Sequence, residues 1–374
     1  MTARKSRKAR RIVVKVGSSS LTRDGLLLTR KVGDLVRQIS ALMDGGHEVV
    51  LVSSGAIALG NAELGWKGED RSLREKQAAA AVGQIGLSEL YRRHFARRKR
   101  RIGQVLLTRS GLTDRERFLN ARHTFLELIR IGVVPVVNEN DTVATEEILF
   151  GDNDNLSATI VSLIDADLLV ILTDVDGLFE SPPTEGQPAP RLIEDIAKIT
   201  PAVRRSAGRS ESATGRGGMI TKLEAAQIAS RSGAGTVICN AGTRDILLRV
   251  ASGERIGTRI EAGERMASRK HWLAFTTRST GELVIDDGAH SALGRRGRSL
   301  LAAGVREVRG KFGVGDAVTC VDREGNAIAR GLVGYNSTDL GRIAGLPTPK
   351  AKRVLGYWNG DEIIHRDDLV LLET

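Results

Sequence analysis

The sequence predicts an α/β protein with a doubly wound, mainly parallel open sheet, followed by a small β-rich domain. Over residues 12–258, short runs rich in valine, isoleucine and leucine alternate with longer segments of helical periodicity, the pattern of βαβ units. Several of the short runs are almost entirely apolar, as parallel strands buried on both faces are. After residue 280 the runs are short, and turns containing glycine and aspartate separate them.

The expected elements follow in order along the chain. Apolar runs predict strands, and three- and four-residue apolar spacing predicts helices. The first helix is expected to stop at Gly45 and Gly46, the usual C-terminal glycine signal. Strands are expected at residues 12–16, 48–52, 104–108, 133–137, 168–173 and 236–240, with a local β segment at 146–150. Helices are expected at 31–43, after 53–55, at 76–93, 114–131, 153–163 and 222–231, and after Thr243.

Length and composition indicate two domains. A chain of 374 residues is too long for one ordinary core. We expect a basic tail at 1–11, a catalytic domain at 12–258, a linker at 259–280 and the β-rich domain at 281–374, with strands at 282–285, 317–321 and 327–333. Residues 180–191 hold four of the eight prolines and are expected to form a surface loop.

The net charge of +11 does not indicate a nucleic-acid-binding surface, because it is concentrated in the tail and the linker. Residues 281–374 carry 13 basic and 13 acidic side chains. No apolar run reaches the roughly 18 residues of a membrane span, and the tail lacks the apolar stretch of a signal peptide. Cys239 and Cys320 are expected to be reduced core residues, and a cytoplasmic location is the default.

Two dense polar clusters indicate a binding site. The strand at 133–137 runs into NEND at residues 138–141, and GDNDNLS at 151–157 opens an apolar helix. Ligands of open α/β sheets lie outside the carboxyl ends of the strands, and helix N-termini favour anions. We therefore expect both clusters to line one pocket.

Two lysines extend this site. Lys15 ends a strand beside Gly17 and Ser18, where it could simply extend into solvent or could contact a phosphate. Lys222 lies in the first turn of a helix that follows Gly217 and Gly218, a position that disfavours a cation unless an anion is present. The chain has no Walker A motif, so this would be a different phosphate site.

Two further segments have ordinary structural explanations as well. Ser53 to Ala56 could be a helix N-cap, and Thr173 to Gly177 could be an Asx turn. Together with the lysines and the polar clusters, however, they suit phosphoryl transfer, which depends on alignment and charge neutralisation more than on covalent chemistry. The nucleophile would come from the substrate.

Seven motifs in one order carry a resemblance to a known family. They are VKVGS at 14–18, SSGAI at 53–57, LTR at 107–109, DRERFLNAR at 114–122, PVVNEND at 135–141, GDNDNLS at 151–157, and GGM at 217–219 with Thr221 and Lys222. On these motifs the chain resembles the glutamate 5-kinase family over nearly all of residues 11–374. The resemblance implies the amino-acid kinase fold, an αβα sandwich, with a C-terminal PUA-like domain, and the ATP-dependent phosphorylation of L-glutamate to L-glutamyl 5-phosphate in proline biosynthesis.

The resemblance also implies roles for individual residues. Ser54, Asp141 and Asn153 would hold glutamate, with Asn138 nearby. Lys15 and Lys222 would stabilise the transferring phosphoryl group, and Asp154 would orient them. The ATP side would comprise Lys15, Gly17, Thr173, Asp174, Arg216, Gly217, Gly218, Met219, Ile220, Thr221 and Lys222. Arg216 departs from the family, which commonly has threonine in that motif. Mg²⁺ would bridge the phosphates, with no protein ligand assigned from the sequence.

Assembly and regulation follow from the same resemblance. It implies a homo-oligomer, a dimer or a tetramer, and feedback inhibition by proline. Two alternative functions are compatible with the pattern. A kinase of the same fold could act on acetylglutamate or aspartate, although Asp141 favours a substrate with a free ammonium group. The PUA-like domain could bind RNA, but its charge balance and the 3% aromatic content argue against this.

Overall fold

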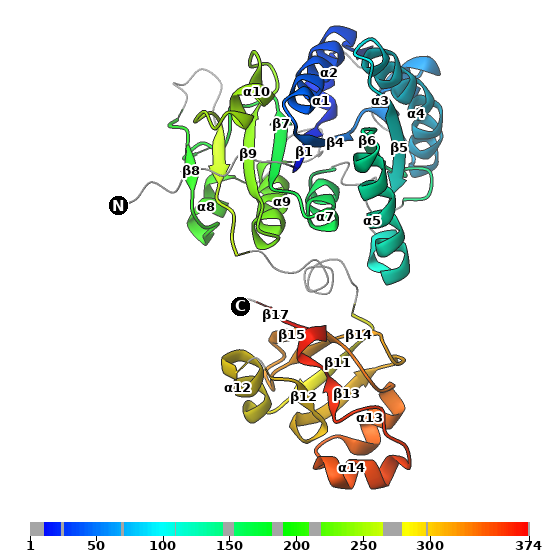
Figure 1. The fold of residues 1–374 in the computed structure, drawn as a ribbon, viewed down its shortest axis with the longest axis vertical. Helices are drawn as coiled ribbons and strands as arrows, with labels where there is room; N and C mark the ends of the chain where they lie inside the picture. Colours follow the sequence, from blue (N-terminus) through cyan, green and yellow to red (C-terminus); the bar gives the residue numbers. More distant parts are fainter. Residues whose placement is uncertain are drawn as a thin grey trace. The chain divides into compact units, whose positions relative to one another are not determined.

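The computed structural model describes residues 11–23, 26–68, 71–108, 110–144, 153–181, 190–208, 218–264, 279–296 and 298–372. The chain divides into two compact units, Met1–Arg265 and Met266–Thr374 (Figure 1). Of the predicted basic tail, Arg11 alone is among the described residues. The expected β segment at 146–150 and most of the proline-rich loop lie outside them.

The first unit is built on an eight-stranded sheet in the order β5-β6-β4-β1-β7-β9-β10-β8. The central strand β1 pairs in parallel with β4 on one side and with β7 on the other. Val14 lies opposite Leu51 of β4 and Val170 of β7. The prediction of a mainly parallel sheet is confirmed. The strands are β1 (Arg11–Val16), β4 (Glu48–Ser53), β5 (Ile102–Leu107), β6 (Val134–Glu139), β7 (Leu168–Thr173), β8 (Asp195–Ile196), β9 (Gly235–Asn240) and β10 (Thr258–Ile260).

β10 runs antiparallel to β9 and includes Arg259 and Ile260, which the sequence analysis assigned to the linker. Its anchor is Thr258, which is fully buried. Thr258 Oγ1 accepts a hydrogen bond from Leu178 N at 2.8 Å and donates one to Ile193 O at 2.6 Å. Ile260 is 2% exposed, so the sheet continues past residue 258.

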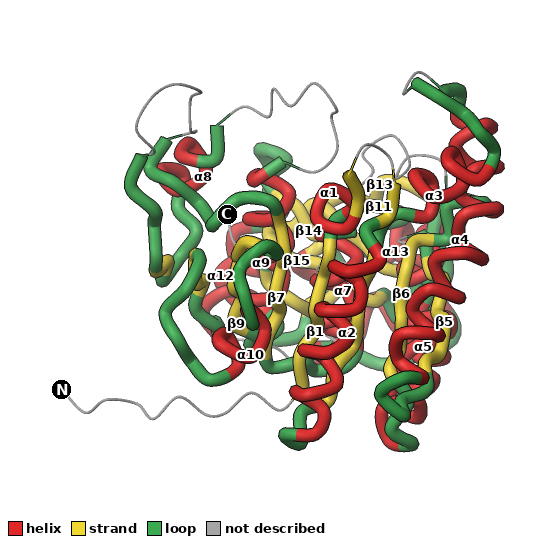
Figure 2. Tube along the Cα trace, turned by 90° about the horizontal axis from the view of Figure 1, so that it is seen from above, coloured by secondary structure: helices red, strands yellow, loops and turns green. Residues whose placement is uncertain are grey.

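Helices cover both faces of the sheet (Figures 1 and 2). On one face, α2 (Thr29–Asp44), α4 (Leu73–Ala96) and α10 (Ile246–Ala251) share a core with β1, β4, β6, β7 and β9. The other face carries α5 (Arg115–Arg130), α7 (Asp154–Leu163) and α9 (Met219–Arg231), where α7 packs against α5 and α9. This is the αβα sandwich that the resemblance implied.

Alternation along β1 determines where its lysine points. Ile12, Val14 and Val16 belong to the core shared with α2, α4 and α10. Because successive side chains of a strand face opposite sides, Val13 and Lys15 face the other layer, which holds α7 and α9. The apolar positions of β1 therefore fix Lys15 on that side.

A close approach of two glycines positions α4 against α3 (Ala56–Glu63). A β-carbon at Gly60 would lie 1.8 Å from Ala79 O, and one at Gly83 would lie 2.0 Å from Ala56 O. Only glycine allows these backbones to come so close. α4 begins with a capping box between Ser72 and Glu75.

The second unit has a five-stranded sheet in the order β13-β11-β14-β15-β17, and β12 pairs with β16. The predicted strands are confirmed as β11 (Gly281–Ile285), β14 (Ala317–Val321) and β15 (Ala327–Leu332). The other strands and the helices were not predicted, because three of these strands have only two or three residues, the fourth is rich in charged residues, and the polar helices lack long apolar patterns. They are β12 (Leu300–Leu301), β13 (Val305–Gly310), β16 (Glu362–Ile364), β17 (Leu369–Leu371), α12 (Asp287–Arg296), α13 (Ser337–Ile343) and α14 (Thr348–Leu355).

Both cysteines are buried and free, as predicted. Burial raises the pKa of each thiol, Cys239 and Cys320, to about 12. Among the described helices, none combines the length and the apolar character needed to cross a bilayer.

Candidate functional site

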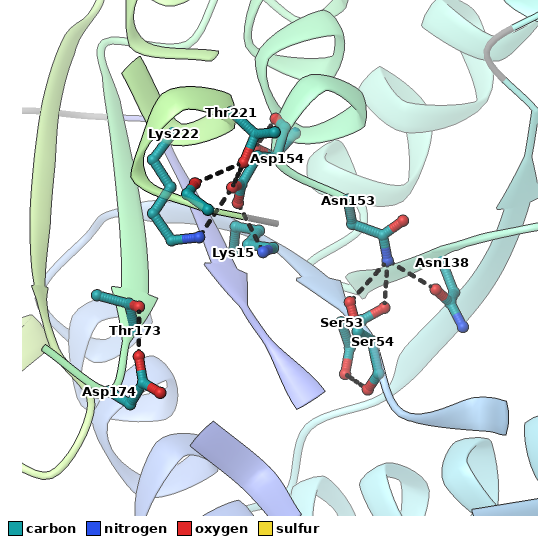
Figure 3. A network of polar contacts seen from close by, with 12 residues as sticks. Lys15, Ser53, Ser54, Asn138, Asn153, Asp154, Thr173, Asp174, Thr221 and Lys222 are labelled. Carbon is teal, nitrogen blue, oxygen red and sulfur yellow. Dashed lines mark hydrogen bonds and ion pairs between the residues drawn. The ribbon is translucent and has the colours of Figure 1, made fainter. Parts of the chain in front are cut away.

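The predicted site residues gather where the central strands end, at the N-terminus of α7. β1 is the point where the sheet order reverses, because β4 and β6 lie on one side of it and β7 and β9 on the other. Open α/β sheets bind ligands at such switch points. The two neighbouring residues Asn153 and Asp154 open α7 there, and their side chains take part in two different polar networks (Figure 3).

The first network places one carboxylate between two lysines. Lys15 Nζ lies 2.6 Å from Asp154 Oδ1, and Lys222 Nζ lies 3.1 Å from Asp154 Oδ2 (Figure 3). Lys15 is 3% exposed, Lys222 is 6% exposed and Asp154 is fully buried. Both ammonium groups lie in a site with little water, where electrostatic interactions are strong. They are therefore placed to interact with a further anion.

The start of α9 adds a hydroxyl group to this network. Thr221 Oγ1 donates towards Asp154 Oδ2 at 3.1 Å and lies 2.8 Å from the carbonyl oxygen of Gly218, the N-cap residue of α9. Met219 and Ile220 form the first turn of α9 and are half-buried. At the end of β1, a β-carbon at Gly17 would lie 3.8 Å from Lys15 Nζ. Arg216 and Gly217 lie outside the described residues.

The second network joins the ends of β4 and β6 to α7. Asn153 Nδ2 donates to Ser53 O at 3.0 Å, to Ser54 Oγ at 3.1 Å and to Asn138 Oδ1 at 2.8 Å (Figure 3). Asn138 and Asn153 are both buried. Three of the four residues expected on the substrate side are thus in direct contact.

Asp141, the fourth expected residue, lies in the turn after β6. Burial raises the pKa of its carboxyl group to about 6. A nearby cation would favour the ionised form and lower this pKa again. Asp141 is therefore suited to a cationic ligand group such as an ammonium, although the structure shows no contact between it and the second network.

On the other side of β1, polar residues end β7 and β9. Thr173 Oγ1 lies 3.0 Å from Asp174 Oδ1, and Asp174 is exposed (Figure 3). Asn240 Nδ2 donates to Asp176 Oδ1 at 2.9 Å. A pocket of about 340 Å³ begins beside these residues. Its lining comprises Asp176, Leu192, Glu194, Asn240, Thr243, Arg255, Ile256 and Gly257.

The sequence analysis missed a set of supporting residues on α4. Gln84 and Tyr91 contact the second network, and Ser88 contacts Gln84. Positions 84, 88 and 91 share one face of a helix, so helical spacing could have grouped them. Nothing in the sequence indicated which strands that face would meet. Asn240, which lines the pocket, was not predicted as a site residue either. It is the polar last residue of an otherwise largely apolar strand, and Thr173 ends β7 in the same way.

The arrangement places two buried lysines and a group of oxygen acceptors side by side at the carboxyl ends of the central strands. The buried lysines can hold a phosphate, while Asp141 and the second network offer oxygen atoms to a cationic group. Among the described residues, no three His, Cys, Asp or Glu side chains converge as a metal-binding cluster. A metal at this site would rely on ligand oxygens, as Mg²⁺ commonly does with phosphates.

Comparison with known proteins gives two domain matches. Residues 10–240 match the amino acid kinase family, and residues 281–355 match the PUA domain. Glutamate 5-kinase of Paraburkholderia phymatum is 50% identical over 366 residues, covering 97% of this chain and 98% of that protein. Glutamate 5-kinase of Teredinibacter turnerae is 49% identical over 365 residues, covering 97% of each chain.

Proposed function

This chain belongs to the glutamate 5-kinases of the amino acid kinase family, and from that premise we propose that it transfers the γ-phosphoryl group of ATP to L-glutamate. An oxygen of the glutamate γ-carboxylate attacks the γ-phosphorus. The bond between the γ-phosphorus and the β–γ bridging oxygen breaks, and the products are L-glutamyl 5-phosphate and ADP. This is the first step of proline biosynthesis.

The observation that carries the proposal is the pairing of Lys15 and Lys222 with the single carboxylate of Asp154. Phosphoryl transfer spreads negative charge over the phosphoryl oxygens and the leaving group. The two buried ammonium groups would stabilise that charge, and Asp154 would hold both lysines in place. No general base is needed, because a carboxylate is already ionised at neutral pH.

Glutamate would lie on the side of Ser54, Asn138, Asp141 and Asn153. Its ammonium group would meet oxygen acceptors, and its α-carboxylate would meet the first N–H groups of α7, where the helix dipole favours an anion. The γ-carboxylate would then point towards Lys15, since Asn153 and Asp154 are consecutive residues of the same helix.

ATP would lie on the side of Thr173, Asp174 and the segment that precedes and opens α9. In this proposal the pocket beside Asp176 and Asn240 receives the nucleoside, because its carboxylates and amide can pair with ribose hydroxyls and the base. Gly217, Gly218 and the first turn of α9 would approach the phosphates, and Arg216 would add a further cation. The donor set fits Mg²⁺ held mainly by the nucleotide, where it would neutralise phosphate charge.

The proposal also covers the oligomeric state of the protein and its inhibition by proline. We propose a homo-oligomer, a dimer or a tetramer, as the resemblance implies; Ile85 on α4 and Val143 after β6, which are 76% and 65% exposed, would be candidates for its interface. Proline would inhibit by feedback, since it shares the ammonium and α-carboxylate that the glutamate side accepts. The buried free thiols suit a reducing compartment such as the cytoplasm.

A coupled ADP-release assay with glutamate, N-acetylglutamate and aspartate tests the proposed reaction. We expect turnover with glutamate and far less with the other two. Asp44→Asn, on the exposed surface of α2, is a matched control that should keep full activity. Preferred turnover of N-acetylglutamate or aspartate would replace glutamate as the substrate, and an absence of ADP release with all three would refute the proposal.

A further inference from the structure

Backbone groups determine which way both asparagine amides of the second network face. Glu139 N donates to Asn138 Oδ1 at 2.9 Å, and a backbone N–H can only donate. Asn153 Nδ2 contacts the carbonyl oxygen of Ser53, which can only accept. Exchanging oxygen and nitrogen in either amide would set donor against donor or acceptor against acceptor. The orientations are therefore fixed by the fold.

The consequence for Asn153 is that its amide hydrogens are already used by the protein. They serve three acceptors, namely Ser53 O, Ser54 Oγ and Asn138 Oδ1. In Figure 3 the side-chain oxygen of Asn153 points away from these acceptors. Within the described part of the chain, Asn153 Oδ1 receives no hydrogen bond. Asn153 can thus offer a ligand an oxygen acceptor, and it cannot offer an N–H donor without breaking this network.

The amide of Asn138, whose orientation Glu139 N sets, is also held in position from α4. Its Nδ2 donates to Gln84 Oε1 at 2.8 Å, so Gln84 supplies the acceptor for that amide. The other end of the Gln84 side chain donates from Nε2 to Ser88 Oγ at 3.1 Å, but a hydroxyl can donate or accept, so it is the contact with Asn138 that sets the Gln84 amide. The close approach of Gly83 to Ala56 O holds this part of α4 near the end of β4.

Tyr91 supports the same network from the next turns of α4. Its hydroxyl lies 2.8 Å from Ser53 Oγ, and Ser53 Oγ lies 3.1 Å from Ser54 O, which can only accept. The Ser53 hydroxyl therefore donates to Ser54 O, and Tyr91 donates to Ser53. One face of α4 thus controls both strand ends that hold Asn153.

We propose that Gln84 is a positioning residue that selects substrates with a free ammonium group. It holds Asn138, and through Asn138 it holds Asn153, with the acceptor Oδ1 turned to the ligand. An ammonium can donate to that oxygen, whereas an analogue lacking the amine leaves the acceptor unpaired. This inference rests on the proposed function, because it assumes that the amino acid lies beside Asn153.

The test measures the KM for glutamate and for ATP in Gln84→Met and Gln84→Glu. Gln84→Met removes the acceptor and leaves the buried Nδ2 of Asn138 unpaired, so the KM for glutamate should rise roughly tenfold or more while that for ATP stays unchanged. Gln84→Glu keeps an oxygen towards Asn138 and should restore the KM to within about threefold of the parent value. Ser88→Ala is the control, because it leaves the contact between Gln84 and Asn138 in place.

A comparison of glutamate with glutarate, which lacks the amino group, separates positioning from a general structural role. We expect Gln84→Met to reduce the preference for glutamate over glutarate, as measured by kcat/KM, by about the same factor as the KM change. Gln84→Leu provides the same readout if Gln84→Met does not fold. An unchanged preference in a folded variant, or equal losses for both substrates, overturns the inference. Failure of the proposed function would instead appear as an absence of glutamate turnover in the parent protein.

Discussion

Replacing Asp154 with asparagine keeps the shape of the side chain and removes the charge that Lys15 and Lys222 share. Both lysines are buried and lie 2.6 and 3.1 Å from the two carboxylate oxygens. Each would then remain in a dry environment without this carboxylate. The variant tests whether both lysines are held as charged partners of Asp154, which is the premise of the proposed phosphate site.

The expected loss of stability is large. Removing one partner of a buried ion pair costs about 3–5 kcal/mol, because a charge is left unpaired. Asparagine keeps one oxygen acceptor, so we expect a value near the lower end, about 3 kcal/mol. For a domain of this size, a change of 1 kcal/mol shifts Tm by about 2–4 °C. The predicted fall in Tm is therefore about 6–12 °C.

Thermal unfolding of the full chain, followed by circular dichroism or calorimetry, measures this shift. Asp44→Asn is the matched control, because it also removes an aspartate paired with a basic side chain. Asp44 is 71% exposed at its side chain and pairs with Arg100. An exposed pair contributes about 0–1 kcal/mol, so its loss should lower Tm by less than about 4 °C.

The comparison between the two variants decides the question. If Asp154→Asn lowers Tm no more than Asp44→Asn does, the lysines are not held by Asp154 as charged partners. The electrostatic basis of the proposed phosphate site would then be wrong, whatever the variant does to catalysis.

Three further predictions concern catalysis and the C-terminal domain. Lys15→Ala and Lys222→Ala should each lower kcat by about 10²–10³-fold, and near-normal turnover in either would contradict its role at the transferring phosphoryl group. Because burial raises the pKa of Asp141 to about 6 and an ammonium ligand requires its ionised form, the KM for glutamate should rise as pH falls below 6. The rise approaches about tenfold per pH unit, and it should be absent in Asp141→Asn. A shortened chain ending at residue 264, which retains β10, should still make glutamyl phosphate. Tight RNA binding by residues 281–374 at physiological salt would contradict the inference, drawn from the balanced charge of this domain, that it does not bind RNA.

The central strands and main helices were predictable because their patterns are long and uniform. β7 has the predicted bounds, since five consecutive apolar residues lead to Thr173, its last residue, and Asp174 follows. β10 was not predicted, because three residues carry no periodicity and its place depends on buried contacts of Thr258. The helices of the second unit were not predicted because they lack a long apolar periodicity. One local signal was present, since the side chain of Asn336 caps the start of α13.

The sequence by itself determined which kinds of groups the site contains. Lysine, aspartate and asparagine next to apolar strand ends and helix starts are costly unless they serve a ligand, so their positions could be identified without coordinates. The tertiary structure alone decided which of them touch. Lys222 and Asp154 are 68 positions apart in the chain, and only the packing of α9 against α7 makes them a pair. The role of Gln84 depends even more on packing, because a glutamine within a helix shows no signal until that helix meets Asn138 at the end of β6.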